Sequence, residues 1–297
     1  MKLLVTGASG WIGSASVTEL MAAGHHVLGL ARSDESAERI VKLGAEVIRG
    51  SLDDLDSLRA AVAQADGVVH LGYNHDFSQM VAAAHTDRAA IEAFAEVLDG
   101  TGGPLVIASG TLGLASGRLA TELDMPDPKA HPRLANSLYT LGLAERGIRA
   151  VVVRFAPTVH GAGGDHGFVA TLARIAREKG VSAYIGDGLN RWPAVHRLDA
   201  AKLVQLAVDQ AHPGSVLHAV AEEGVIARDI ATVIGQYLNV PIDTVPVELA
   251  AKHFDWLGLF FSADIPALSQ VTRNELGWVP AHSTLLEDIA AGHYPGR

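Results

Sequence analysis

The chain has 297 residues, of which 48% are hydrophobic, and it carries a formal net charge of −10. Such a chain can bury a large core, and its acidic balance without a Lys or Arg cluster argues against nucleic acid or an anionic membrane as a partner. The absence of cysteine excludes disulfides, thiolate catalysis and Cys-ligated metal centres. We recognise neither a signal peptide nor an apolar run of membrane-spanning length, so we expect a cytoplasmic protein.

Short apolar runs alternate with longer Ala-rich stretches of helical character up to about residue 220. The runs that predict buried strands are Lys2–Val5, His26–Leu30, Glu46–Ile48, Gly67–Leu71, Pro104–Ala108, Ala150–Phe155 and Val216–Val220. The stretches that predict helices are Ile12–Ala23, Ser36–Lys42, Leu55–Gln64, Thr86–Leu98, Asn136–Arg146, Phe168–Lys179, Asp199–Gln210 and Ala227–Leu238. Because neighbouring parallel strands need a long connection, this alternation predicts an α/β fold of the Rossmann type, with a doubly wound parallel sheet.

The alternation weakens after Phe155, where Pro, Gly and His become frequent. We therefore predict a dinucleotide-binding domain over residues 1–155, with residues 197–220 returning to its sheet. Residues 156–196 and 221–297 would form a smaller C-terminal lobe that faces the substrate.

A Gly-rich turn follows the first predicted strand and opens the first helix, with the sequence Thr6-Gly7-Ala8-Ser9-Gly10-Trp11-Ile12-Gly13. In a dinucleotide site, the first Gly allows a tight turn, the second lets the backbone approach the pyrophosphate, and the third lets helix pack on strand. The N-terminus of the helix then faces the anion. We expect the segment from Gly7 to Gly13 to bind a dinucleotide.

The end of the second strand indicates which dinucleotide. It reads Leu30-Ala31-Arg32-Ser33 and offers no carboxylate for a ribose, whereas Arg32 and Ser33 can donate hydrogen bonds to a 2′-phosphate. This pattern favours NADP(H). The alternative is that Arg32 is a solvated residue paired with Asp34 or Glu35.

Six segments together resemble the extended short-chain dehydrogenase/reductase family, and the resemblance runs through nearly the whole chain. They are Thr6–Gly13, Val69–Gly72, Val106–Thr111, Val153–Gly161, Ala194–Asp199 and Glu275–Pro280. The resemblance implies that Leu52 lies against the adenine, beside Ser51, which stands where many relatives carry an Asp. It also implies that Leu71-Gly72-Tyr73 follows the ribose and that the segment Phe155-Ala156-Pro157-Thr158 borders the nicotinamide.

The same resemblance places Thr111 at the family's catalytic Ser/Thr position, with Ser109 as a second catalytic candidate in that motif. The family's Tyr-x-x-x-Lys pair falls at Lys129 and Arg133, so its tyrosine is missing. Tyr139 lies nearby, but the residue four positions later is Leu143, and we interpret Tyr139 as a packing residue. The chain is thus an atypical member.

Hydride transfer to a carbonyl needs a group that neutralises the oxygen as charge develops. Thr111 can donate a hydrogen bond but is a poor sole acid, and His75, His160 and His166 are histidines that could reach the pocket or lie elsewhere. A substrate with a phenolic hydroxyl beside its ketone could supply its own proton. Because it lacks this pair, the chain also resembles atypical ketoreductases that act on angucyclinone polyketides, such as that of simocyclinone biosynthesis.

Aromatic residues of the second lobe would line the substrate pocket, because a flat apolar ligand suits aromatic walls. The substrate candidates are Tyr73, His75, His160, Phe168, Trp192 and Trp256. Alternatively, His253–Phe261 is one amphipathic helix that packs into the core or forms a dimer face. Arg191 could mark a charged substrate, pair with Asp187 or cap a helix.

We expect no metal site, since neither His70 and His75 nor His160 and His166 have helical ligand spacing. The leading hypothesis is an NADPH-dependent ketoreductase acting on a bulky, aromatic, polyketide-like molecule, with a role in antibiotic biosynthesis. The alternatives are a nucleotide-sugar epimerase or dehydratase, and a non-catalytic NADP(H)-sensing regulator. The protein would be a monomer or a homodimer.

Overall fold

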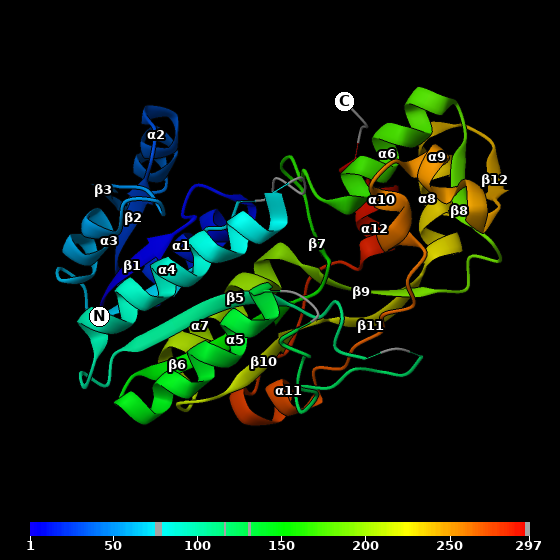
Figure 1. Cartoon of the computed structure of the whole chain (residues 1–297). Coiled ribbons are helices and arrows are strands. Elements are labelled where there is room, and N and C mark those ends of the chain that lie inside the picture. The colour runs from blue at the N-terminus through cyan, green and yellow to red at the C-terminus, as the bar shows by residue number, and fades with distance from the viewer. Residues whose placement is uncertain (75–78, 116, 130–131, 295–297) are drawn as a thin grey trace.

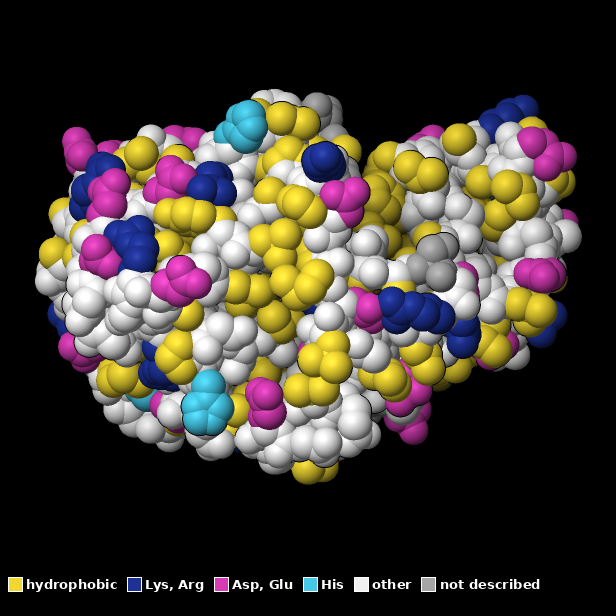
Figure 2. Space-filling model, turned by 60° about the horizontal axis from the view of Figure 1, so that its bottom comes forward, with side chains coloured by type: hydrophobic (Ala, Val, Ile, Leu, Met, Phe, Trp, Pro, Cys, Tyr) yellow, Lys and Arg dark blue, Asp and Glu magenta, His cyan; other side chains and the backbone are white. Residues whose placement is uncertain are grey.

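The computed structural model describes residues 1–74, 79–115, 117–129 and 132–294. A larger body built on one sheet lies beside a smaller lobe that contains most of the chain's second half (Figure 1). Figure 2 shows a notch in the surface between the two, with hydrophobic side chains on its walls. None of the helices in the described ranges is both long and apolar enough to cross a bilayer.

The central sheet follows the order β10-β6-β5-β4-β1-β2-β3, and every neighbouring pair is parallel. Its strands are β1 (Lys2–Thr6), β2 (His26–Ala31), β3 (Glu46–Arg49), β4 (Gly67–His70), β5 (Pro104–Gly110), β6 (Arg149–Phe155) and β10 (Val216–Ala219). Each coincides with a predicted apolar run to within two residues. The prediction of a doubly wound parallel sheet is confirmed.

Helices cover both faces of this sheet. They are α1 (Trp11–Ala22), α2 (Asp34–Lys42), α3 (Leu55–Val62), α4 (Met80–Leu98), α5 (Pro132–Gly142), which continues as the 3-10 turn η2 (Leu143–Arg146), and α7 (Arg197–Gln210). Alternate residues of β1 serve the two faces: Leu3 and Val5 join the core under α1 and α7, whereas Leu4 joins the core under α3 and α4. All three are fully buried, as expected for a strand covered on both sides.

The second half of the chain adds short strands that the apolar pattern did not predict. The strands β7 (Thr158–His160), β9 (Arg191–His196) and β11 (Glu222–Ile226) form one small sheet, and β8 (Ser182–Ile185) pairs with β12 (Ile242–Val245). The smaller lobe also contains α6 (Phe168–Lys179), α8 (Ala227–Leu238), η3 (Val247–Leu249), α9 (Ala250–Phe254), α10 (Leu257–Phe261) and α12 (Leu285–Ala290). Helices α6 and α8 match their predicted ranges.

Two expectations about this half need correction. The single amphipathic helix over His253–Phe261 is interrupted, because Asp255 adopts a positive φ of 51° between α9 and α10. The region 221–297 is also not one lobe, since α11 (Gln270–Leu276) packs on the larger body, where Leu276 and Trp278 join the core beside α7 and β10.

Candidate functional site

The Gly-rich turn between β1 and α1 is tight enough to exclude side chains at two of its glycines. Gly7 has a φ of +68°, and a Cβ there would lie 2.7 Å from the backbone nitrogen of Gly72. A Cβ on Gly13 would lie 1.9 Å from the carbonyl oxygen of Gly7, so α1 packs directly on the turn. The helix begins without a capping side chain and without an acid in its first turn. Its first N–H groups therefore suit a phosphate anion, and the cradle fits a dinucleotide.

Trp11 turns its side chain away from this cradle. Its indole nitrogen donates a hydrogen bond of 2.8 Å to the carbonyl of Val159, and the guanidinium of Arg197 lies 4.1 Å from the centroid of its ring. Arg197 also donates to the hydroxyl of Ser14 at 3.4 Å. Trp11 thus fastens α1 to β7 through its side chain, and only its backbone remains to face a phosphate.

Arg32 is exposed at the end of β2, next to Ser33, which caps α2. Its predicted partners bind other cations: Asp34 pairs with Arg49 at 2.6 Å, and Glu35 pairs with Arg39 at 2.5 Å. Across the part of the chain that the structure describes, Arg32 has no ion pair. The alternative in which Asp34 or Glu35 neutralises Arg32 is therefore wrong.

The adenine and ribose candidates lie at the same carboxyl edge of the sheet. Ser51 follows β3 and accepts a 3.4 Å hydrogen bond from the backbone of Asp53, while Leu52 packs partly buried against the core under α3 and α4. After β4, the Gly72 N–H donates to the Thr6 hydroxyl at 3.0 Å. The contact between Gly72 and Thr6 holds the loop after β4 beside the Gly-rich turn.

The two catalytic candidates on β5 differ in what they bind. Ser109 accepts a 2.8 Å hydrogen bond from the hydroxyl of Ser137 on α5. The Thr111 hydroxyl is buried and has no hydrogen-bond partner among the described residues, and the hydroxyl of Thr158, after β6, is in the same state. Buried hydroxyls normally find a partner, so the hydroxyls of Thr111 and Thr158 stand out at this edge as buried groups whose hydrogen bonding is not satisfied. The sequence placed Thr158 at the end of the segment expected to border the nicotinamide but gave it no role of its own.

The positions of the family's Tyr and Lys hold very different residues. Lys129 is exposed, and its backbone N–H donates to Asp127. Arg133 lies at the start of α5, with its guanidinium 3.8 Å from the centroid of the Tyr73 ring. Burial lowers the pKa of Arg133, and the charge of Asp87 opposes that effect. A cation therefore stands at the lysine position, and no acid stands at the tyrosine position.

Asp87 belongs to a buried polar chain that joins α4, β1, β4 and α5. The His70 ring bonds the Thr6 hydroxyl at 2.6 Å and Asp87 at 3.2 Å, and the Asn136 amide donates to Asp87 at 2.7 Å. Burial alone would raise the pKa of Asp87, but the hydrogen bonds from His70 and Asn136 and the charge of Arg133 hold it below its usual value. Asp87 is thus a buried anion, and sequence reasoning missed it because its partners are distant along the chain.

The substrate candidates do not all line one pocket. His160 and Trp192 are each only 1% exposed: the His160 ring bonds Asp288 at 2.6 Å, and the Trp192 indole donates to the Ala263 carbonyl. Neither presents surface to a ligand, contrary to expectation. His75 lies outside the described residues.

Phe168 and Trp256 are more accessible. The Phe168 ring packs edge-on against Trp192 at 5.3 Å and lies 5.7 Å from the ring of Trp256, which is 42% exposed. Phe260 stacks on the same ring of Phe168 at 6.0 Å. Trp192 therefore supports an aromatic surface from behind, and Trp256 is its exposed member.

Arg191 is engaged by a carboxylate other than the one predicted. Its guanidinium binds both oxygens of Asp264, at 3.0 and 2.8 Å, whereas Asp187 accepts from the backbone of Leu189. The expected pairing of Arg191 with Asp187 is wrong. Because Asp264 already pairs with the guanidinium of Arg191, that cation is not left open for a phosphate-bearing substrate.

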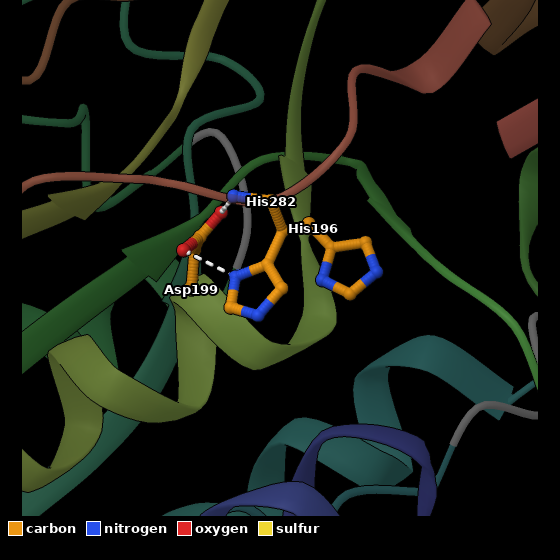
Figure 3. Close-up of side chains that lie close together, drawn as sticks. All are labelled: His196, Asp199 and His282. Atoms are coloured by element: carbon orange, nitrogen blue, oxygen red, sulfur yellow. Dashed lines mark hydrogen bonds and ion pairs between the residues drawn. The ribbon is translucent and has the colours of Figure 1, made fainter. Parts of the chain in front are cut away.

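His196, Asp199 and His282 come together in space, a grouping that the sequence spacing did not suggest (Figure 3). Asp199 accepts from the backbone of Ala281 and from both the backbone and the ring of His282, and His196 accepts from the backbone of Leu198. The two imidazole rings stack at 4.7 Å with an interplanar angle of 10°. The hydrogen bonds of Asp199 hold the backbone at residues 281 and 282 in place.

A profile of the NAD dependent epimerase/dehydratase family matches residues 3–220, and the chain therefore belongs to this family. It is 48% identical over 296 residues to the uncharacterized protein C2A9.02 of Schizosaccharomyces pombe, covering 99% of this chain and 100% of that protein. It is 43% identical to the uncharacterized protein YLL056C of Saccharomyces cerevisiae, covering 99% of each.

Two more distant similarities name an activity or a cofactor. One is to the 4-hydroxy-2-methyl-3-oxo-4-farnesyl-3,4-dihydroquinoline-1-oxide ketoreductase of Stigmatella aurantiaca, at 26% identity over 90% of this chain and 84% of that protein. The other is to the solved structure of the Thermus thermophilus UDP-glucose 4-epimerase in complex with NAD, with a TM-score of 0.76, 21% identity and coverage of 100% and 99%. The structural likeness shows a shared fold, and the family is one of NAD-dependent enzymes.

Proposed function

We propose that this protein is an NADPH-dependent ketoreductase that reduces a carbonyl of a bulky, aromatic, polyketide-like small molecule. The observation that carries the proposal is the contrast between a complete dinucleotide cradle and a catalytic edge without an acid at the tyrosine position. Gly7 and Gly13 leave room for nothing but a close-packed turn, while Lys129 lies exposed. A ketone can still be reduced without this tyrosine if the proton comes from another source, such as a hydroxyl of the substrate.

The choice of NADP(H) over NAD(H) rests on Arg32. Its guanidinium is exposed at the end of β2, no acid of its neighbourhood pairs with it, and Ser33 adds a hydroxyl beside it. A cation at this place favours a 2′-phosphate on the adenosine ribose.

The roles of the chain's own residues follow from their contacts. A bound reduced nicotinamide would supply the hydride. The unpaired Thr111 hydroxyl would donate a hydrogen bond to the carbonyl oxygen, where negative charge develops. Arg133, at the lysine position, would hold the nicotinamide ribose, and the aromatic surface around Trp256 would receive the rest of the substrate.

One feature disfavours the epimerase or dehydratase alternative. Arg191 is already bound by Asp264 instead of being open to a sugar diphosphate. The ketoreductase from Stigmatella aurantiaca adds support, because its name gives as its substrate a farnesylated oxo-dihydroquinoline, which is a bulky bicyclic ketone.

The test is a screen of the full chain with NADPH against a panel of aromatic ketones, half with a hydroxyl beside the carbonyl and half without. Oxidation of NADPH with at least one ketone supports the reductase. Binding of NADPH without turnover of any ketone would instead favour a sensor that has kept the fold and lost the chemistry. Turnover of nucleotide sugars without NADPH consumption would favour the epimerase.

A further inference from the structure

Tyr73 and Arg133 form a cation–phenol pair at the catalytic edge. The guanidinium of Arg133 lies 3.8 Å from the centroid of the Tyr73 ring, close enough for a cation–π contact. Arg133 lies at the start of α5, and Tyr73 lies in the loop after β4. The family's tyrosine and lysine both belong to one helix, whereas this pair joins two elements. The pair thus places a tyrosine beside the cation that stands at the lysine position.

Tyr73 leaves the sheet at the same edge as Thr111. Strands β4 and β5 are parallel neighbours in which His70 pairs with Ile107, so residues just beyond them emerge together. A second chain of contacts joins the two: the Ser137 hydroxyl lies 3.5 Å from the backbone oxygen of Arg133 and donates to Ser109 at 2.8 Å, within the motif that ends in Thr111.

The charge of Asp87 stabilises the cation of Arg133. Asp87 accepts hydrogen bonds from His70 and Asn136 that keep it ionised, and its charge raises the pKa of the partly buried Arg133, against the effect of burial. The pKa of the half-buried Tyr73 phenol is raised, chiefly by burial. The charge of Arg133 opposes this rise, and the charge of Asp87 adds to it. A cation against the ring favours the phenolate, which is what a phenol needs if it is to give up a proton.

We propose that Tyr73 is the proton donor of the reduction and that Arg133 is the cation that stabilises its phenolate. This inference rests on the proposed reductase function. The carbonyl carbon takes a hydride from the reduced nicotinamide, and the carbonyl oxygen takes the proton of the Tyr73 hydroxyl, so the ketone becomes an alcohol and the nicotinamide is left oxidised. The phenolate of Tyr73 regains its proton from water.

The chain contains a matched control for this pair. Tyr139 on α5 has the guanidinium of Arg88 3.4 Å from its ring centroid, but its ring packs against the core under α3 and α4. Tyr139→Phe therefore removes a phenol with the same kind of cation contact from a place away from the cofactor edge.

The first experiment compares Tyr73→Phe with Tyr139→Phe, using ketones that lack a neighbouring hydroxyl. We expect Tyr73→Phe to lower kcat by about 10² to 10⁴ while the Kd for NADPH changes less than about threefold, because general acid catalysis contributes on that scale. Tyr139→Phe should retain its rate. A Tyr73→Phe enzyme that reduces these ketones at the wild-type rate would overturn the proposal and leave the reductase function intact.

The second experiment needs no turnover. The ultraviolet absorbance of phenolate, recorded against pH for the wild type minus Tyr73→Phe, reports the titration of Tyr73 alone. We expect Arg133→Gln to move that titration to higher pH and Arg133→Lys to restore part of the shift. If the Arg133 variants leave the titration of Tyr73 unchanged, the proposed pairing is contradicted. If they shift it but the protein oxidises NADPH with none of the ketones, the pairing stands, and both the proposed function and the donor role of Tyr73 are contradicted.

Discussion

The dinucleotide cradle and the catalytic edge lie at the same end of the sheet but are built differently. The cradle is local: Gly7 and Gly13 are six residues apart, and steric contact between them defines the turn. The catalytic edge is assembled from four elements, with Tyr73 after β4, Asp87 on α4, Thr111 after β5 and Arg133 on α5. A local motif survives as a unit, whereas an assembled site can exchange its parts while the fold stays the same.

The largest effect should come from the cradle. Gly13→Ala places a methyl group 1.9 Å from the Gly7 carbonyl oxygen, so the backbone must move and we expect loss of detectable NADPH binding. The control is Gly142→Ala, a helical glycine whose added Cβ meets nothing within 4 Å. That variant should bind NADPH normally and gain up to about 1 kcal/mol in free energy of unfolding. Equal NADPH affinity in the two variants would refute the steric account.

These regions also differ in how far the sequence predicts them. The seven strands of the central sheet are apolar runs because both faces are covered, and the turn is readable because its constraint lies within a few residues. In strand β12 three of the four residues are exposed, and in β11 Val225 is the one buried residue. Neither strand therefore shows an apolar run. The Tyr73–Arg133 contact and the true partners of Asp34 and Glu35 depend on tertiary packing, which spacing alone does not encode.

The next largest effect concerns Asp87, which supports the catalytic edge from the core. Asp87→Asn removes a buried negative charge that stabilises the partly buried Arg133, and we expect the free energy of unfolding to fall by about 3 kcal/mol in denaturant titrations at pH 7. A loss below about 0.5 kcal/mol would show that Arg133 does not depend on this carboxylate.

The pH dependence of stability follows from the same residue. The pKa of Asp87 is lower in the folded protein than in the unfolded chain, so its contribution is present above about pH 4 and is lost as the pH falls through the lowered folded pKa. The wild type should therefore lose stability more steeply than Asp87→Asn below about pH 4. Parallel curves for the two proteins would contradict an ionised Asp87.

A smaller effect is expected at Thr111, whose hydroxyl assists the developing charge on the carbonyl oxygen. Thr111→Val keeps the shape of the side chain and should lower kcat by about tenfold to a hundredfold with little change in NADPH affinity. Ser109→Ala provides the comparison, because Ser109 is already bonded to Ser137 and should change kcat less. A larger loss of kcat in Ser109→Ala than in Thr111→Val would show that Ser109, and not Thr111, assists the carbonyl oxygen.

The smallest effect tests cofactor choice. Arg32→Ala should weaken NADPH binding by about tenfold and leave NADH binding unchanged, since only the 2′-phosphate needs the guanidinium. Arg49→Ala, in which the removed cation is already paired with Asp34, is the matched control and should not alter the ratio. An NADPH to NADH affinity ratio that Arg32→Ala leaves intact would remove the argument for NADP(H).

The most direct test of the central claim is a crystal structure of the protein with NADP⁺ and an aromatic ketone or its alcohol product. We predict that the 2′-phosphate contacts Arg32 and that the substrate oxygen lies within hydrogen-bond distance of the Tyr73 phenol and the Thr111 hydroxyl. A substrate oxygen facing solvent or another side chain, with Tyr73 turned away from it, would contradict the claim that these residues replace the missing tyrosine.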